Sequence, residues 1–256
     1  MTKQIISMSY NPFSLEGKTV MVTGASSGIG RETAISCSKM GAKVIITGRN
    51  KERLQETFDS LCGDSNVQLI ADLTKQDELE NLVNNVDKID GLVLCAGKSC
   101  SLPVLFSTRE KFDEIYNVNF FSPVELLRLL AKKKCFQLNS SVVVMVSIGG
   151  TGRWTPGNAI YGSSKAALKS MVQYFAIELA PKKIRVNGIC PGMVETPLIQ
   201  GGTLTQEQLD EDRNKYPLKR YGQPADVANG AIYFLSDASS WVTGSSLVID
   251  GGITAK

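Results

Sequence analysis

Histidine is missing from the whole sequence of 256 residues. Its absence excludes Ser-His-Asp triads, Cys-His pairs and histidine-ligated metal sites, and we expect no metal ion. Acid–base chemistry near neutral pH must therefore use another side chain with a shifted pKa. CxxC pairs are missing too, although there are six cysteines: Cys37, Cys62, Cys95, Cys100, Cys135 and Cys190. Scattered cysteines predict reduced thiols in a cytosolic protein, some of them in the core.

A large excess of charge is also missing. The formal net charge is +3 and no basic run exceeds three residues, which argues against a nucleic-acid partner. No apolar run approaches the ~20 residues of a membrane span, and residues 1–18 lack the continuous apolar stretch of a secretory signal. We therefore expect a cytoplasmic protein with neither a membrane nor a nucleic-acid partner.

Apolar, β-branched runs alternate with stretches of helical spacing. Strands are predicted at residues 18–23, 42–47, 67–71, 91–97, 142–146, 184–190 and 246–250, the fourth run including its turn. Helices are predicted at residues 31–40, 51–61, 108–134, 159–180 and 224–236. This alternation predicts right-handed crossovers and a parallel sheet. We expect residues 1–256 to form a single α/β domain, with a doubly wound parallel sheet of about seven strands and helices on both faces.

A glycine-rich turn, residues 24–30, links the first strand to the first helix, which Gly41 ends. A strand, such a turn and a helix form the context of a dinucleotide fingerprint. The glycines allow close approach of the backbone to a pyrophosphate, and the helix N-terminus supplies free N–H groups. A plain tight turn is the alternative, and we favour nucleotide binding.

The end of the second strand indicates which dinucleotide is bound. A carboxylate there would bind the ribose hydroxyls of NAD, but the sequence has Gly48-Arg49-Asn50. Arg49 can face the 2′-phosphate of NADP with a planar cationic fork, and the alternative is a solvent-exposed arginine. Asp72 ends the third strand and can accept from an adenine amino group, cap the next helix, or do both.

The long helix at residues 108–134 is expected to break or kink near Pro123. Asn117 and Asn119 lie within it, where asparagine usually faces solvent or competes for backbone hydrogen bonds. Its basic tail, Arg128 and residues 132–134, complements the helix dipole. The alternative is a docking patch for an acidic carrier, to which Lys182 and Lys183 would add charge.

The remaining chemistry gathers around the fifth strand. Ser147 follows the β-branched residues 142–146, so it lies at the carboxyl end of a buried strand. Tyr161 and Lys165 are four residues apart and share a helix face. An ammonium near a phenol lowers the phenol's pKa, and an opposing serine can bind the same substrate oxygen. This pattern predicts proton transfer for a carbonyl/alcohol pair, although a Tyr–Lys pair alone is usually a solvated surface pair.

Pro191-Gly192 ends the sixth strand where the cofactor should lie, and Thr196 follows. The next residues are polar with an amphipathic centre at 206–214. We interpret residues 193–217 as a possible mobile lid over the substrate.

Together these elements make nearly the whole chain similar to the short-chain dehydrogenases/reductases. The family's Thr-Gly-x-x-x-Gly-x-Gly element is matched here by Thr23, Gly24, Gly28 and Gly30. Its Tyr-x-x-x-Lys element is matched by Tyr161 and Lys165, with Ser147 upstream, and further matches are Asn119, Pro191-Gly192 and Thr196. The resemblance implies a Rossmann fold.

The resemblance also implies roles for the catalytic set, Asn119, Ser147, Tyr161 and Lys165. Tyr161 is the general acid in reduction, and Lys165 lowers its pKa and holds the nicotinamide ribose. Ser147 polarises the substrate carbonyl, and Asn119 anchors a water that connects Lys165 to solvent. The nicotinamide supplies the hydride, so the protein's task is positioning and electrostatics.

The expected cofactor is NADP, in its reduced form NADPH. Its expected contacts are Gly24, Ser26, Ser27, Gly28, Ile29, Gly30, Arg49, Asp72, Leu73, Cys95, Ala96, Gly97, Tyr161, Lys165, Pro191, Gly192, Val194 and Thr196. The expected substrate neighbours are Ser147, Gly149, Trp154, Tyr161 and Met193, with Trp154 equally consistent with packing. Cys95 replaces the asparagine that the family usually has after the fourth strand, so we expect a local rearrangement there.

Within the family, the chain is most similar to the 3-oxoacyl-[acyl-carrier-protein] reductases, and Val242-Thr243-Gly244 through Asp250-Gly251-Gly252 is typical of that group. The resemblance implies an NADPH-dependent reduction of a carbonyl to an alcohol, on a small substrate that is either free or an acyl group bound to a carrier. It also implies a homotetramer, or a homodimer. The alternatives are a dehydrogenase of a sugar, steroid or other small alcohol, and a non-catalytic NADP-binding protein.

Overall fold

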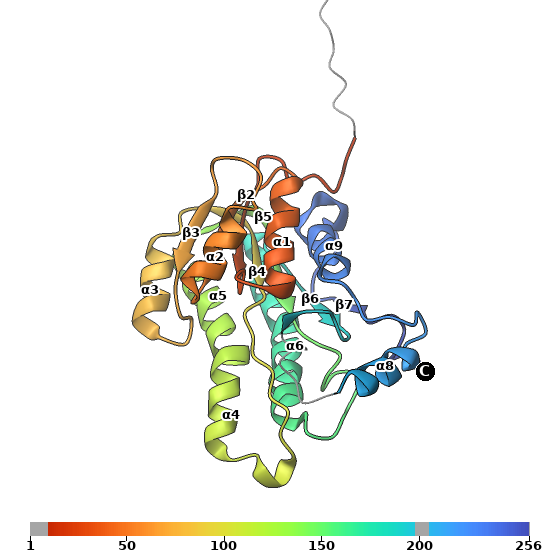
Figure 1. The fold of residues 1–256 in the computed structure, drawn as a ribbon. Helices are drawn as coiled ribbons and strands as arrows, with labels where there is room; N and C mark the ends of the chain where they lie inside the picture. Colours follow the sequence, from red (N-terminus) through yellow and green to blue (C-terminus); the bar gives the residue numbers. More distant parts are fainter. Residues whose placement is uncertain (1–9, 198–204, 256) are drawn as a thin grey trace, which may run out of the picture.

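The computed structural model describes residues 10–197 and 205–255. It confirms the predicted fold: seven parallel strands form one sheet in the order β3-β2-β1-β4-β5-β6-β7 (Figure 1). The strands are β1 (Thr19–Thr23), β2 (Lys43–Gly48), β3 (Val67–Ile70), β4 (Ile89–Leu94), β5 (Phe136–Met145), β6 (Arg185–Pro191) and β7 (Ser246–Ile249). The strand order reverses direction between β1 and β4, and doubly wound sheets open a ligand crevice at such a point.

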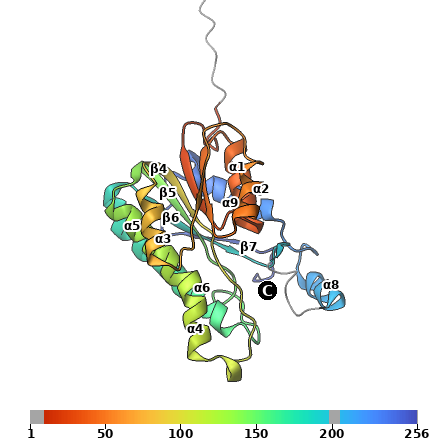
Figure 2. The ribbon, with the colours of Figure 1, turned by 60° about the vertical axis from the view of Figure 1, so that its left-hand side comes forward.

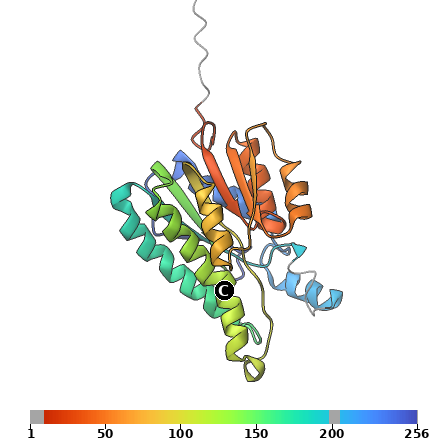
Figure 3. The ribbon, with the colours of Figure 1, turned by 90° about the vertical axis from the view of Figure 1, so that its left-hand side faces the viewer.

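Helices cover both faces of this sheet. They are α1 (Gly28–Lys39), α2 (Lys51–Phe58), α3 (Gln76–Asn84), α4 (Arg109–Tyr116), α5 (Ser122–Lys132), α6 (Ala159–Leu179), α8 (Gln206–Lys215) and α9 (Pro224–Leu235). Figure 2 shows α1, α2 and α9 on one side of the sheet and α3 to α6 on the other. Figure 3 shows this second layer, coloured from yellow to teal, in front of the sheet. Helix α8 stands outside both layers.

Each face of the sheet has its own apolar core. Leu126 and Val172 belong to the core beneath α3, α5 and α6. Leu54 and Phe234 belong to the core beneath α1, α2 and α9. Burying one such side chain stabilises the fold by about 1.5–3 kcal/mol. The two cores hold the sheet in place, so its carboxyl edge is a rigid base for a site.

Strand β5 begins at Phe136, earlier than the predicted residue 142. Its pairing with β4 shifts register between Ile89 and Gly91. Asn139 adopts a positive φ of 63° in this stretch, and Leu138 beside it is exposed. The early part of the strand is therefore not buried on both sides, which is why it lacks the apolar pattern on which the prediction rested.

The predicted break in the long helix is confirmed, but it lies one turn before Pro123. Residues Asn117–Phe121 form a π-helical turn between α4 and α5. Proline cannot donate to the carbonyl four residues earlier, which here belongs to Asn119, and its ring crowds that carbonyl. The wider turn relieves this clash, and the Ser122 hydroxyl donates to the Asn117 carbonyl at 2.6 Å. The alternative in which Asn119 faces solvent is excluded, because Asn119 is 0% exposed.

The basic tail of α5 complements the dipoles of two helices: Lys132 lies in the last turn of α5 itself, and Lys133 reaches the C-terminal end of α3. The Lys133 ammonium donates to the carbonyls of Val83, Asn84 and Val86, at the C-terminal end of α3. Arg128 is paired with Glu125 at 2.5 Å. Lys133 and Arg128 are therefore already engaged within the protein, which leaves less positive charge for a carrier-docking patch.

The predicted lid lies partly outside the described residues, which omit 198–204. Its amphipathic centre forms α8, and Thr205 and Gln208 make a capping box at its start. Within residues 10–197 and 205–255, no helix has both the length and the apolar character needed to cross a membrane.

Candidate active site

The glycine-rich turn has no room for side chains at two of its positions. A Cβ on Gly24 would lie 2.8 Å from the backbone of Ala96, and one on Gly30 would lie 2.3 Å from the Gly24 carbonyl. Gly24 and Gly28 also adopt positive φ angles of 66° and 55°. A Cβ on Gly28 would lie 3.1 Å from Thr196. The turn is bare backbone packed against the other predicted cofactor loops, which fits close approach of a pyrophosphate.

Helix α1 begins at Gly28, three residues earlier than predicted. Its first turn therefore lies inside the glycine-rich turn. Ser27 is the N-cap residue, but its side chain makes no capping hydrogen bond. The free N–H groups of Gly28, Ile29 and Gly30 thus belong to the helix N-terminus, where an anion is stabilised.

The buried hydroxyl of Thr23 connects the loop after β4 to β1 through hydrogen bonds. The Thr23 hydroxyl accepts from the amides of Cys95 and Ala96 at 3.0 and 3.2 Å and donates to the Val93 carbonyl. Thr23 was matched to the family motif but was not in the predicted site. It fixes the backbone of Cys95 and Ala96, and with it the position of Gly97.

At the end of β2, Arg49 is exposed and close to Asp72 on the neighbouring β3 end. Burial raises the pKa of the Asp72 carboxyl, but the hydrogen bonds from Thr74 and then the Arg49 guanidinium together lower it below its usual value. Ser26 lies at the same corner, since a Cβ on Gly48 would be 3.4 Å from its hydroxyl. A cation and a hydroxyl thus lie together where a ribose phosphate is expected.

One alternative for Asp72 is wrong: it does not cap α3. The N-cap residue of that helix is Lys75. The Asp72 carboxylate accepts from the amide and hydroxyl of Thr74 instead, at 3.0 and 2.7 Å. This is a local turn that ends β3 and precedes the helix. Leu73, between them, packs against the apolar core.

Two glycines allow the Ser147 loop to press on α6. A Cβ on Gly150 would lie 2.1 Å from the Gly162 carbonyl, and Gly150 has a φ of 76°. Ser147 accepts a 3.0 Å hydrogen bond from the Gly149 amide. Its hydroxyl and the Tyr161 ring lie on the same side of Gly149, 3.2 and 3.5 Å from where a Cβ would be, and the Ser147 hydroxyl lowers the pKa of Tyr161. The predicted Ser147–Tyr161 pair is therefore brought together.

Lys165 lies on the same side of α6, with its side chain only 4% exposed. Its ammonium donates to the Met145 carbonyl at 2.8 Å, and a Cβ on Gly97 would lie 3.5 Å from it. Burial lowers the pKa of Lys165 to about 8. Lys165 is thus a buried cation between the loop after β4 and α6, the helix that also carries Tyr161, and this burial excludes the surface-pair alternative.

The direction predicted for the pKa of Tyr161 is wrong in this structure. Burial raises the pKa of Tyr161, the hydrogen bond with Ser147 lowers it, and the nearby Cys95 raises it further. Removal of the phenol from water disfavours the phenolate, and the Lys165 ammonium is directed to the Met145 carbonyl. Tyr161 is consequently held as a protonated phenol.

Asn119 ties the loop after β4 to α6. Its side-chain oxygen accepts from the Lys98 amide at 2.8 Å. Its nitrogen donates to the Lys98 carbonyl and to the Ser164 hydroxyl, at 3.0 and 3.1 Å. Ser164 in turn donates to the Tyr161 carbonyl. The Asn119 side chain thereby connects the backbone next to Gly97 with the helix turn that carries Tyr161.

The turn at Pro191 and Gly192 is bonded directly to the Ser147 loop. The Ile148 amide donates to the Pro191 carbonyl at 3.0 Å. The Gly192 amide donates to Ile249 on β7 at 2.9 Å. Val194 is buried and forms a short parallel bridge with Gly222. The predicted cofactor residues of this segment therefore lie beside the predicted catalytic serine.

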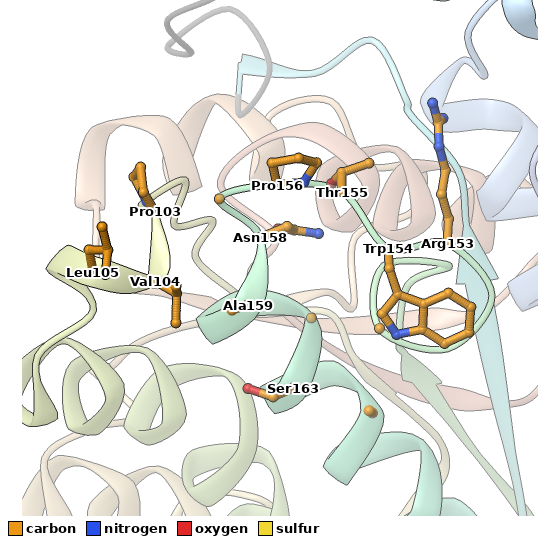
Figure 4. A pocket seen from close by; sticks show the side chains of 14 residues that line it. Pro103, Val104, Leu105, Arg153, Trp154, Thr155, Pro156, Asn158, Ala159 and Ser163 are labelled. Atoms are coloured by element: carbon orange, nitrogen blue, oxygen red, sulfur yellow. The ribbon is translucent and has the colours of Figure 1, made fainter.

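The predicted substrate neighbours fall in three places. Gly149 is buried against Ser147 and Tyr161. Trp154 is 77% exposed and lines a cavity of about 710 Å³ with Val104 and Leu105 (Figure 4). Ser147 and Tyr161 are not among the described residues that line this cavity. The Met193 amide donates a hydrogen bond to the hydroxyl of Tyr216, which follows α8.

Asn158 was missed by the sequence analysis. It is the N-cap residue of α6, yet its side chain makes no capping hydrogen bond. A Cβ on Gly149 would lie 2.9 Å from its amide nitrogen and 3.2 Å from the Ser147 hydroxyl. The amide group thus lies beside the Ser147 hydroxyl. Its position three residues before Tyr161, on the same helix face, was the available signal.

Comparison with known proteins agrees with this geometry. A family model described as enoyl-(acyl carrier protein) reductase matches residues 24–254. The 3-oxoacyl-[acyl-carrier-protein] reductase FabG of Rickettsia bellii is 34% identical over 93% of this chain and 98% of its own. L-xylulose reductase of Mus musculus is 31% identical over 94% and 98%. A solved structure of a putative NAD(P)-dependent gluconate 5-dehydrogenase of Beutenbergia cavernae, with bound NADP, is 30% identical and covers 96% and 100%, with a TM-score of 0.87. The chain belongs to the short-chain dehydrogenase/reductase family of oxidoreductases.

Proposed function

We propose that this protein is an NADPH-dependent reductase that converts a carbonyl to an alcohol, with a 3-oxoacyl thioester as the favoured substrate class. The observation that carries the proposal is one juxtaposition. The Ser147 hydroxyl and the Tyr161 ring both lie against Gly149, and the buried Lys165 ammonium comes from the same helix as Tyr161 and lies next to Gly97. Reduction of a carbonyl needs a proton donor, an oxygen-binding hydroxyl and a held cofactor, and these residues supply all three.

Each residue has one task in this proposal. Tyr161 donates its phenolic proton to the carbonyl oxygen, and the raised pKa keeps that proton in place until substrate binds. Ser147 donates a hydrogen bond to the same oxygen. Lys165 stabilises the phenolate that remains and binds the nicotinamide ribose. Asn119 positions Lys98 and Ser164 around them, and a water bound at Asn119 would return the proton.

The bare glycine turn fits the pyrophosphate of NADPH, and the residues that would hold the cofactor are the predicted set. Its phosphates would be held by Gly24, Ser26, Ser27, Gly28, Ile29 and Gly30. Its adenosine side would be held by Asp72, Leu73, Cys95 and Ala96. Its nicotinamide side would be held by Gly97, Pro191, Gly192, Val194 and Thr196. When bound, NADPH supplies the hydride. The protein's own task is to hold the hydride donor and the substrate carbonyl in a reactive orientation.

NADPH is favoured over NADH by the charge at the end of β2. Arg49 and the Ser26 hydroxyl lie near Gly48, where a carboxylate would select NAD. Arg49→Asp should shift the ratio of kcat/KM for NADPH to that for NADH by roughly tenfold or more toward NADH. Arg53→Asp changes an exposed arginine one turn along α2 and serves as the control. An unchanged ratio in Arg49→Asp would contradict the role of Arg49.

The comparisons suggest two further candidate activities, alcohol oxidation and enoyl reduction. The relatives include a sugar reductase and a putative gluconate dehydrogenase, so oxidation of a small alcohol is the second candidate. The description of the matching family model names enoyl reduction, in which a carbon–carbon double bond is reduced. A proton donor beside a serine suits a carbonyl oxygen, which places enoyl reduction behind both. A non-catalytic NADP-binding protein would have no need of the buried Lys165.

The proposal extends to the protein's surroundings. We place the substrate against Ser147 and Gly149, with Met193 and Trp154 on its outer side and residues 193–217 as the lid. Carrier-bound acyl groups are included, with Lys182 and Lys183 as the remaining docking charges. We also propose a cytoplasmic location, consistent with six free cysteines, and a homotetramer or homodimer.

The deciding experiment is NADPH consumption with a short 3-oxoacyl thioester, run beside an enoyl thioester, a pentulose and a small ketone. Parallel assays with NADH, and with the alcohols plus NAD or NADP, complete the set. Fast NADPH-dependent turnover of the 3-oxoacyl thioester supports the proposal. Faster alcohol oxidation with NAD, or turnover of the enoyl thioester alone, would overturn it.

A further inference from the structure

A buried tyrosine outside the predicted site reaches residues 191–195, here named the nicotinamide turn because Pro191, Gly192 and Val194 are predicted nicotinamide contacts. Tyr216, at the C-terminal end of α8, is 1% exposed. Its hydroxyl accepts a 3.2 Å hydrogen bond from the Met193 amide. The neighbouring amides of Gly192 and Glu195 donate to backbone carbonyls, of Ile249 and Gly222. The Met193 amide thus differs from them in depending on a side chain 23 residues further along the chain.

The same hydroxyl is bonded to the other side of the site. Arg153, in the loop between Ser147 and α6, donates to the Tyr216 hydroxyl at 3.4 Å and lies over its ring at 5.9 Å. Arg153 also pairs with Asp212 of α8 at 3.2 Å. The phenol therefore stands between the turn that follows β6 and the loop that follows β5. Because it is buried, its pKa is raised, and it stays a neutral acceptor for both donors.

We propose that Tyr216 is a positioning residue for the reduction: its hydroxyl fixes the Met193 end of the nicotinamide turn relative to the loop that carries Ser147, and Arg153 completes the link. This inference rests on the proposed function, because it concerns where the nicotinamide lies relative to the catalytic hydroxyls. Small errors in such placement reduce the rate of the chemical step more than they reduce binding. The adenosine and phosphate contacts lie elsewhere, around Gly24 and Arg49.

The chain offers a matched control for this tyrosine. Tyr221 is also 1% exposed, and its ring meets that of Tyr216 edge-on at 5.4 Å. Its hydroxyl donates to Leu209 and Asp212 and not to the nicotinamide turn. Tyr216→Phe and Tyr221→Phe therefore each remove one buried hydroxyl from the same cluster, but only the first leaves the Met193 amide without its partner.

Hydrogen exchange tests the link without any substrate. In Tyr216→Phe the amides of residues 192–195 should exchange about fivefold faster than in the wild type, the effect of one lost hydrogen bond. Tyr221→Phe should leave them within twofold. Equal exchange in the two variants would overturn the link, and this result does not depend on the enzyme's substrate.

Kinetics test the positioning. With rates normalised to the NADPH-binding fraction, Tyr216→Phe should lower kcat about fivefold and change the Kd of NADPH less than twofold. Arg153→Met should lower kcat in the same direction, and the double variant should be no slower than Tyr216→Phe alone. Faster exchange with unchanged kcat, or an equal loss of kcat in Tyr221→Phe, would overturn the positioning role. If the wild type reduces no carbonyl, the proposed function fails while the exchange result still decides the link.

Discussion

The burial of Lys165 predicts how stability should depend on pH. Burial lowers the pKa of this lysine from 10.5 to about 8. The unfolded chain therefore binds more protons than the folded one between these values, so stability rises with pH across that window. Each pH unit is worth about 1.4 kcal/mol, which gives a rise of about 3 kcal/mol in total and about 2 kcal/mol from pH 7 to pH 10.

Lys165→Met isolates this effect. The substitution keeps the apolar stem and removes the ammonium together with its bond to the Met145 carbonyl. Loss of that bond does not depend on pH, whereas loss of the titration does. Urea unfolding at several pH values should therefore show the wild type gaining about 2 kcal/mol over the variant between pH 7 and pH 10.

Lys132→Met removes an exposed lysine from α5 and is the control, for which the difference from wild type should stay constant with pH. Parallel stability curves for the wild type and Lys165→Met would refute the reasoning. They would mean that water reaches the ammonium, or that its charge is compensated in the folded state.

Three further outcomes follow from the geometry. The kcat/KM for NADPH should fall as pH rises through about 8, where Lys165 loses its proton, and a flat profile to pH 10 would contradict a charged lysine. Gly150→Ala should destabilise the protein more than Gly63→Ala, by about 1–3 kcal/mol in urea unfolding, because both have positive φ but only Gly150 meets a backbone oxygen, that of Gly162. Thr23→Val should weaken NADPH binding and lower stability by about 1–3 kcal/mol, since the Cys95 and Ala96 amides lose their acceptor. An unchanged Kd for NADPH and an unchanged midpoint of urea unfolding would contradict this role of the Thr23 hydroxyl.

Local patterns in the sequence predicted the fold and the core of the site. The β-branched runs became parallel strands, and the pair Tyr161 and Lys165 lies on one buried helix with Ser147 opposite. These inferences needed only the period of each element and the rule that ligands bind at the carboxyl ends of parallel strands.

Features that depend on distant contacts were out of reach. The pKa of Tyr161 rises because of its burial, which spacing along a helix does not reveal. The spacing of the residues does not reveal the π-helical turn at Asn117–Phe121, and Asp72 binds Thr74 instead of capping α3. The link from Tyr216 to Met193 joins segments on either side of residues 198–204, and no motif marks it.

The most direct test of the central claim is NADPH-dependent carbonyl reduction by Tyr161→Phe. Tyr174→Phe, at an exposed position on the same helix, is the control. Our account predicts that Tyr161→Phe binds NADPH with wild-type affinity but loses at least about a hundredfold in kcat, the share of a positioned proton donor, while Tyr174→Phe stays active. Retained turnover in Tyr161→Phe would contradict the assignment of this tyrosine as the proton donor.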